Sequence, residues 1–278
     1  MAAGTLKAVL ICCAVGFVLA GCQRPAPPIV LDPGDVKDTL GYDDLAVVLK
    51  AAVAEQGLLI PDALRKRADA LDRQLRLLAA AGPASTPEQF TSRDDVLAYW
   101  YNARAAWSMK LALACNCPTE FQRSELTDRL FPLDGRKMSL DMIDHELSSD
   151  GDWRVVVAAP GVTLTRARLP DRPFSGKDIR PRIVEGVSQF VDDDRRFVID
   201  MASQRVIVPR VIWQFRQRLL AEYRADFGGE GEGLLTALLP YVTGSAHRRL
   251  QDAIGYRLVP AAGTMPIALL ADAWKAAL

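Results

Sequence analysis

The sequence predicts a mostly helical α+β domain with a small β-sheet or hairpin, and three observations support this fold class. Of its 278 residues, 50% are hydrophobic and 24% are charged, which is the balance of a folded globular chain. Apolar residues recur at helical spacing over most of the length. Only short stretches, in residues 155–159 and 197–208, have the composition of strands. The length suits one domain with a proper core.

The first element, residues 1–21, predicts a cleaved signal peptide. Lys7 precedes an apolar run over 8–19, which is shorter than the ~20 residues of a membrane-spanning helix. A run of this length is typical of a signal-peptide apolar region. The next four residues, Leu19-Ala20-Gly21-Cys22, resemble the lipobox of bacterial lipoproteins. That resemblance implies a diacylglyceryl thioether on Cys22, cleavage before it and acylation of the new amine.

The lipid predicts the location of the protein. Palmitate-type acyl chains on Cys22 would hold it on a membrane of the cell envelope. In Gram-negative bacteria an Asp at the next position usually retains a lipoprotein at the inner membrane. Gln23 stands there instead, which favours the outer membrane and a domain facing the periplasm. The proline-rich residues 22–38 predict an extended tether, and residues 39–278 predict a single globular domain.

The following elements are predicted from periodicity and from end signals. Ser92 with Asp95 resembles a capping box, Pro209 suits the first turn of a helix, and Gly228 suits a helix end. Helices are predicted from Asp43 to about Gly57, from Pro61 to a stop at Gly82-Pro83, from Ser92 to about Cys115, over 139–147, 177–191 and 209–227, and near 232–242, 246–254 and 266–277.

Two strand regions and one long loop are predicted between these helices. The run Val155–Ala159 has the composition of a buried strand. Residues 160–175 are rich in Pro, Gly and Arg and predict a loop. The segments 197–201 and 205–208 flank three turn-forming residues and predict a hairpin.

Two motifs resemble a known family. Residues 98–103, Ala-Tyr-Trp-Tyr-Asn-Ala, are similar to the aromatic-Trp-x-Asn-Ala helix of the family called domain of unknown function 547. Residues 140–146, Leu-Asp-Met-Ile-Asp-His-Glu, are similar to its Leu-x-x-Ile-Glu-His segment. With the pattern from Val206 to Gly228, the resemblance covers about residues 90–257. It implies the architecture of that family more than an activity, since the family has no firmly assigned reaction.

The chain lacks two sequence features of that family, and one of them could be catalytic. Members usually carry cysteines after the His segment, but residues 157–166 contain none. The family's Tyr-Asp-Trp ending is also missing, and Ile254-Gly-Tyr256 stands in its place. If the family cysteine is a nucleophile beside the His, this chain has lost it.

The candidate catalytic residues are His145, Asn102 and Glu146. Imidazole can act as a base near neutral pH, Glu146 and Asp144 could orient it, and Asn102 could hold a ring nitrogen. A Cys–His–Asn group needs a thiol within hydrogen-bond reach of the ring. Because the only thiols of the mature chain beyond Cys22 lie in another segment, we expect His145 and Asn102 to form a buried polar contact rather than an active site.

Those thiols are Cys115 and Cys117, a possible disulfide or thiol pair. A bridge between residues two apart is strained, although export permits disulfides. Two inert thiols at a helix end and an accessible redox pair remain open alternatives. Two sulfurs without further ligands fall short of a zinc site, so we expect no metal and no cofactor.

Two further groups of residues could meet a ligand. Trp100 and Trp107, seven residues apart, predict the core face of their helix, whereas Tyr99 and Tyr101 could line a groove. Arginines of the long loop and the helix after it could meet phosphate head groups or acidic glycans, although nearby aspartates favour an ordinary exposed loop. They are Arg166, Arg168, Arg172, Arg180 and Arg182.

The sequence thus favours a lipid-anchored envelope protein with a non-catalytic binding or structural role and a degenerate site. Its expected partners are the membrane, through Cys22, and a protein or glycan. The 34 basic and 34 acidic residues argue against nucleic-acid binding, which needs a basic surface. The alternative is a thiol-dependent hydrolase or transferase that uses His145 with an unusual cysteine.

Overall fold

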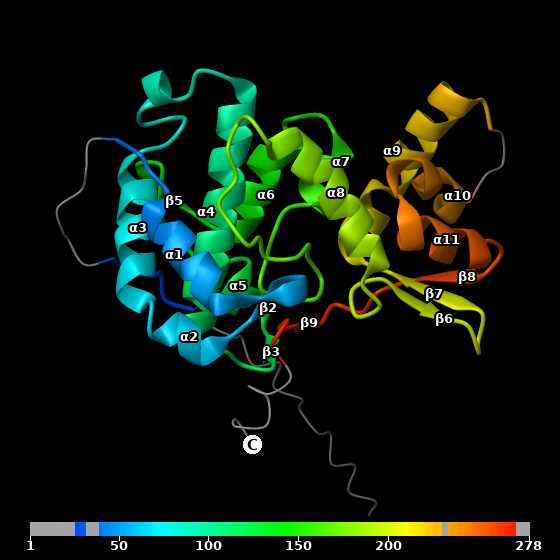
Figure 1. The fold of residues 1–278 in the computed structure, drawn as a ribbon, viewed down its shortest axis with the longest axis horizontal. Helices are drawn as coiled ribbons and strands as arrows, with labels where there is room; N and C mark the ends of the chain where they lie inside the picture. Colours follow the sequence, from blue (N-terminus) through cyan, green and yellow to red (C-terminus); the bar gives the residue numbers. More distant parts are fainter. Residues whose placement is uncertain (1–25, 32–38, 230–232, 271–278) are drawn as a thin grey trace, which may run out of the picture.

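The element on which the larger group of helices packs is α4 (Arg93–Ala114), which lies among several neighbouring helices (Figure 1). The computed structural model of the chain describes residues 26–31, 39–229 and 233–270. Residues 97–109 of α4 are all buried, so the helix is enclosed on every face. Ser92 caps it by accepting a hydrogen bond from the Asp95 amide at 3.1 Å, as predicted. It is contacted by α2 (Pro61–Arg65), α3 (Ala68–Ala80), α5 (Arg123–Leu126), α6 (Leu140–Ser148) and α8 (Ile179–Asp192).

Helices dominate the described residues. Figure 1 shows the helices of residues 43–148 on one side, the strands and helices of residues 198–260 on the other, and the two helices of residues 153–192 between them. Their bounds are α1 Asp43–Ala52, α2 Pro61–Arg65, α3 Ala68–Ala80, α5 Arg123–Leu126, α6 Leu140–Ser148, α7 Trp153–Val157, α8 Ile179–Asp192, α9 Arg210–Phe227, α10 Leu234–Leu238 and α11 Gly244–Asp252, with short 3-10 turns at Glu55–Gly57, Pro87–Gln89 and Leu239–Tyr241.

The strands of the described residues are short and form four small sheets. The pairs are β1 (Val53–Ala54) with β2 (Leu58–Leu59), β3 (Glu120–Phe121) with β9 (Met265–Pro266), β4 (Phe131–Leu133) with β5 (Arg136–Met138), and β6 (Val198–Asp200) with β7 (Arg205–Val208), which also pairs with β8 (Arg257–Pro260). All pairs are antiparallel except β7 with β8. The predicted α+β class, mostly helical in one domain with small sheets, is confirmed.

The end of the described chain returns across the molecule. After β8 it runs back to the first group of helices, where β9 pairs with β3 (Figure 1). The Leu59 amide donates to the Ala268 carbonyl at 2.7 Å, and the Ile267 amide donates to the Thr119 carbonyl at 3.1 Å. This segment therefore links the two sides, and it passes over the long loop on its way.

Residues 26–31 of the predicted tether lie against the domain. The Ile29 amide donates to the Leu130 carbonyl at 2.9 Å, and Arg129 donates to the Pro27 carbonyl at 2.8 Å. Ile29 and Leu31 pack on the core. The signal peptide, the lipobox and Cys22 lie outside the described residues. No helix within the described ranges is long and apolar enough to cross a bilayer.

One predicted strand is wrong. Residues Val155–Ala159 are buried as expected, but α7 contains the valines as a single helical turn. Asp152 begins this turn by accepting a hydrogen bond from the Arg154 amide at 2.9 Å. A segment that is buried on all sides can consist of valines whether it is a strand or a helix. Composition alone therefore could not separate a buried strand from a buried helical turn.

Several predicted helix limits shift for local reasons. Helix α1 begins at Asp43 but ends at Ala52, because the next two residues form β1 and pair with β2 after a short turn. The helix predicted from Pro61 is divided into α2 and α3 at residues 66–67. The hairpin at 197–208 and the stop of α9 at Gly228, with φ 69°, are confirmed. The helix predicted from residue 266 is wrong at its start, where β9 lies; residues 271–278 lie outside the described ranges.

The packing of Trp107 in the core predicts a large loss of stability when this side chain is truncated. Trp107 is fully buried and stacks on Phe131, with ring centroids 4.1 Å apart. We expect Trp107→Ala to lower the free energy of unfolding by about 3–5 kcal/mol, measured by urea denaturation. The matched control is Phe227→Ala, because Phe227 is 56% exposed at the end of α9. Equal losses for the two variants would contradict the central position of α4.

Candidate functional site

The candidate site is built on an arginine within the buried helix. Arg104 of α4 is only 1% exposed, among aromatic and alanine neighbours. A buried guanidinium must be paired, since an isolated charge there is very costly. Arg104 Nε lies 2.7 Å from Asp144 Oδ1, and its Nη2 lies 3.3 Å from Oδ2. Its Nη1 donates to the Pro160 carbonyl at 2.5 Å, so all three nitrogens are used.

A second arginine shares the same carboxylate. Arg166, in the loop after α7, places Nη2 2.5 Å from Asp144 Oδ2. Burial by itself would raise the pKa of Asp144, but Arg104 and Arg166 more than offset it and hold that pKa below the usual carboxyl value. The cluster therefore has two cations and one anion, and it joins α4, α6 and the loop.

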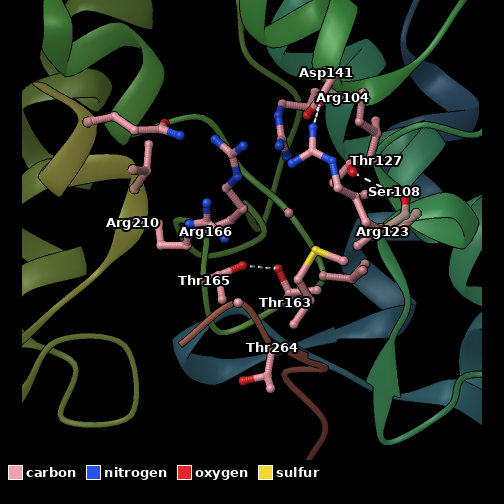
Figure 2. Close-up of a pocket in the computed structure, with 18 residues that line it drawn as sticks. Arg104, Ser108, Arg123, Thr127, Asp141, Thr163, Thr165, Arg166, Arg210 and Thr264 are labelled. Carbon is pink, nitrogen blue, oxygen red and sulfur yellow. Dashed lines mark hydrogen bonds and ion pairs between the residues drawn. The ribbon is translucent and has the colours of Figure 1, made fainter. Parts of the chain in front are cut away.

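A pocket opens beside this cluster. Its volume is about 120 Å³, above the ~10–15 Å³ that holds one water and below the ~300 Å³ of a typical small-molecule site. Figure 2 shows arginines around it and three threonines along its lower edge. The polar lining residues are Arg104, Arg123, Arg166, Arg210, Gln214, Asp141, Ser108, Thr127, Thr163, Thr165 and Thr264.

The lining is strongly positive. It contains four guanidinium groups and one carboxylate, that of Asp141. Asp141 forms an ion pair with Arg123, whose side chain is 62% exposed. Burial raises the pKa of Asp141 despite this pair, in contrast to Asp144 one helical turn further along α6. Arg210, at the start of α9, has no carboxylate partner among the described residues.

Two glycines allow the arginines to approach the backbone. A Cβ on Gly161 would lie 2.9 Å from Arg104 Nη1 and 3.1 Å from the Arg166 Cβ. A Cβ on Gly263 would lie 3.2 Å from Arg210 Nη1. Larger side chains at these positions would displace the arginines or occupy the space in front of them.

The structure does not bring His145 and Asn102 together, so the expected buried contact between them is wrong. His145 is exposed on α6 and forms no hydrogen bond or ion pair with any described residue. Glu146 pairs with Arg136 at 2.7 Å instead of orienting the imidazole. Asn102 is fully buried, donating to the Phe174 carbonyl at 2.9 Å and accepting from the Phe174 amide at 2.8 Å. It fixes the loop before α8.

The two cysteines form no disulfide in this structure. Cys115 and Cys117 are both free and half-buried at the end of α4. Burial raises the pKa of each thiol. A raised pKa lowers the fraction of thiolate, which is the nucleophilic form. Among the described residues, neither sulfur has a hydrogen bond with a histidine, and the Cys115 sulfur accepts one from Arg129.

Tyr99 and Tyr101 do not line a groove, and that prediction is wrong. Both are buried, because α4 is enclosed on the two flanks as well as on the tryptophan face. The Tyr99 hydroxyl donates to the Leu78 carbonyl at 2.8 Å, and the Tyr101 hydroxyl donates to the Val155 carbonyl at 2.6 Å. Their polar ends therefore find partners inside the protein, as buried tyrosines usually do.

The arginine-rich segment is not an ordinary exposed loop. Each of its five arginines has a carboxylate partner, and these ion pairs attach the loop to α4, α6 and α8. The pairs are Arg166 with Asp144, Arg168 with Asp193, Arg172 with Asp178, Arg180 with Asp94 and Asp150, and Arg182 with Asp171 and Asp178. Of the five, only Arg166 lines the pocket.

Reasoning from the sequence missed most of this pocket. Arg104 carried a signal that could have identified it, since it is the only charged residue between Asp95 and Lys110 of α4, and an arginine buried in such a stretch needs a carboxylate partner. Asp144 was considered only as a neighbour of His145, although it points to Arg104 instead. Arg123, Arg210 and Thr264 carried no local signal, because distant segments meet here only in the folded chain.

The comparisons with known proteins identify no relative of this chain. The sequence matches no protein-family model, no curated protein and no solved structure. The resemblance to domain of unknown function 547 therefore stays a prediction. Within the described ranges, no group of three His, Cys, Asp or Glu side chains could hold a metal ion.

The shared carboxylate predicts a pH-dependent loss of stability. We expect Asp144→Asn to lower the free energy of unfolding at pH 7 by about 3–5 kcal/mol, because two largely buried guanidinium groups lose their partner. Since the folded-state pKa of Asp144 is lowered, its contribution is complete above the unfolded value of about 3.9 and is lost as the pH falls through the folded value. The deficit of the variant should therefore shrink in acid.

Urea unfolding of both proteins between pH 7 and pH 2 measures this difference. Asp141→Asn on the same helix is the control, and it should cost no stability at pH 7, because the pKa of Asp141 is raised in the folded protein. A deficit for Asp144→Asn that stayed constant down to pH 2 would contradict the assignment.

Proposed function

We propose that this protein is a non-catalytic binding protein of the bacterial cell envelope, anchored by lipid on Cys22, whose domain binds a negatively charged group. The single observation that carries the binding function is the pocket in which four arginines face one carboxylate. The lipobox resemblance at residues 19–22 carries the anchor. On this proposal the outer membrane is the favoured site, with the domain facing the periplasm.

The geometry supports binding over catalysis. Nucleophilic catalysis needs a nucleophile within hydrogen-bond reach of a base. The thiols of Cys115 and Cys117, whose pKa is raised by burial, lie at the end of α4, and His145 is exposed on α6 with no hydrogen-bond or ion-pair partner among the described residues. The pocket itself is lined by arginines and hydroxyls without a histidine, cysteine or pair of carboxylates. These groups can hold and orient an anion, and the one carboxylate of the lining, that of Asp141, is held in an ion pair with Arg123.

The lipid anchor is tested by metabolic labelling. Cells grown with labelled palmitate should yield a labelled protein in the membrane fraction, whereas Cys22→Ser should abolish the label and leave the precursor uncleaved. The Cys117→Ser variant is the control and should be labelled like the unsubstituted chain. An unlabelled, water-soluble protein that still begins at Met1 would contradict the anchor.

The thiol-enzyme alternative predicts a different reactivity. We expect Cys115 and Cys117 of the folded protein to react with iodoacetamide at pH 7 no faster than a free thiol of ordinary pKa, because burial raises the pKa of both. The rate of alkylation, followed by mass spectrometry, should be the same in His145→Ala. Rapid alkylation of one thiol that slowed at least tenfold in His145→Ala would instead favour the enzyme.

A further inference from the structure

One nitrogen in the pocket has an unused hydrogen-bonding capacity. Nη1 of Arg166 is buried and has no partner among the described residues, while Nη2 of the same guanidinium is held by Asp144. An unpartnered buried donor is unfavourable, and more so when the group is charged. Arg166 lines the pocket, so a ligand there can supply the missing acceptor.

A second guanidinium is also free to bind. Arg210 comes from the opposite part of the chain, at the start of α9, and lines the same pocket (Figure 2). It has neither an ion pair nor a side-chain hydrogen bond with any described residue. The other two arginines are committed, Arg104 to Asp144 and the Pro160 carbonyl, and Arg123 to Asp141 and Asp128.

Hydroxyl donors from separate segments complete the lining. Thr163 and Thr165 lie 2.9 Å apart through their Oγ1 atoms, and one of the two hydroxyls therefore keeps its proton for another acceptor. Thr264 comes from the returning end of the chain (Figure 2). The donors therefore converge from the loop, from α9 and from the C-terminal segment.

We propose that this pocket binds a phosphate group, with Arg166 and Arg210 as its two principal ligands and the threonine hydroxyls as further donors. This inference rests on the proposed function, in which the pocket is the binding site, and it names the class of ligand. A planar carboxylate is satisfied by one arginine fork. A tetrahedral anion with three or four acceptor oxygens suits donors that converge from several directions, and arginine favours it.

The size of the pocket supports the same class. Its volume of about 120 Å³ admits one small anionic group rather than a whole drug-sized molecule. Two of the lining arginines, Arg123 and Arg210, are exposed, so a phosphate ester could place its phosphate inside and its organic part in solvent. Inorganic phosphate and a phosphoglycerol head group share this chemistry.

The test is a calorimetric titration of the full chain in a non-ionic detergent. Inorganic phosphate, glycerol 3-phosphate and acetate are titrated separately at equal ionic strength. We expect both phosphates to bind and acetate to bind at least tenfold more weakly. Tighter binding of glycerol 3-phosphate would indicate a lipid head group as the source, and tighter binding of inorganic phosphate a free anion.

The variants are chosen so that each has a matched partner. Arg210→Gln should weaken phosphate binding at least tenfold, whereas Arg224→Gln should leave it unchanged. Both arginines are exposed on α9 and lack an ion-pair partner among the described residues. The two substitutions also change the net charge of the protein by the same amount. Arg166→Lys keeps the charge beside Asp144 but removes the free Nη1, and it should also weaken binding at least tenfold.

The outcomes separate this inference from the proposed function. If acetate binds as tightly as phosphate, and Arg210→Gln weakens both, the pocket is the binding site but the phosphate class is wrong. If Arg210→Gln and Arg224→Gln weaken binding equally, the ion is attracted only by net charge, and the site itself is overturned. Absence of phosphate binding to the folded chain overturns the inference directly.

Discussion

The ion pair between Arg104 and Asp144 is the constraint on which the rest of the structure depends. Arg104 lies on a helix that is buried on all sides, and a guanidinium there is tolerated only with a carboxylate beside it. Asp144 brings α6 against α4, and the Pro160 carbonyl brings the loop against both. The pair therefore decides where three segments meet, and the pocket opens where they meet.

The same constraint explains why the pocket is positive. Asp144 pairs with two arginines but carries only one negative charge, so the cluster keeps a net positive charge beside the pocket. Asp141, the only carboxylate of the lining, is occupied by Arg123. A chain with equal numbers of basic and acidic residues can thus contain a local excess of positive charge, because that excess is set by the pairing of side chains rather than by net charge.

Asn102, a catalytic candidate, and Tyr101, a groove candidate, have structural roles. Asn102 holds the backbone of Phe174 through two hydrogen bonds, and Tyr101 holds that of Val155. Both interactions fix the segments on either side of the arginine-rich loop, which carries Arg166 into the pocket. His145, the other catalytic candidate, lies outside this network, on the exposed face of α6.

The sequence by itself determined the fold class, the start and cap of α4, the hairpin at 197–208 and the end of α9, because caps, periodicity and turn residues act within a few neighbouring positions. It could not assign the conformation of Val155–Ala159, since burial on every side removes the periodicity that separates strand from helix. Only the tertiary structure decided which polar residues meet. Arg104, Arg166 and Arg210 are up to about a hundred residues apart, and long-range electrostatic pairing leaves no local pattern from which their common pocket could be read.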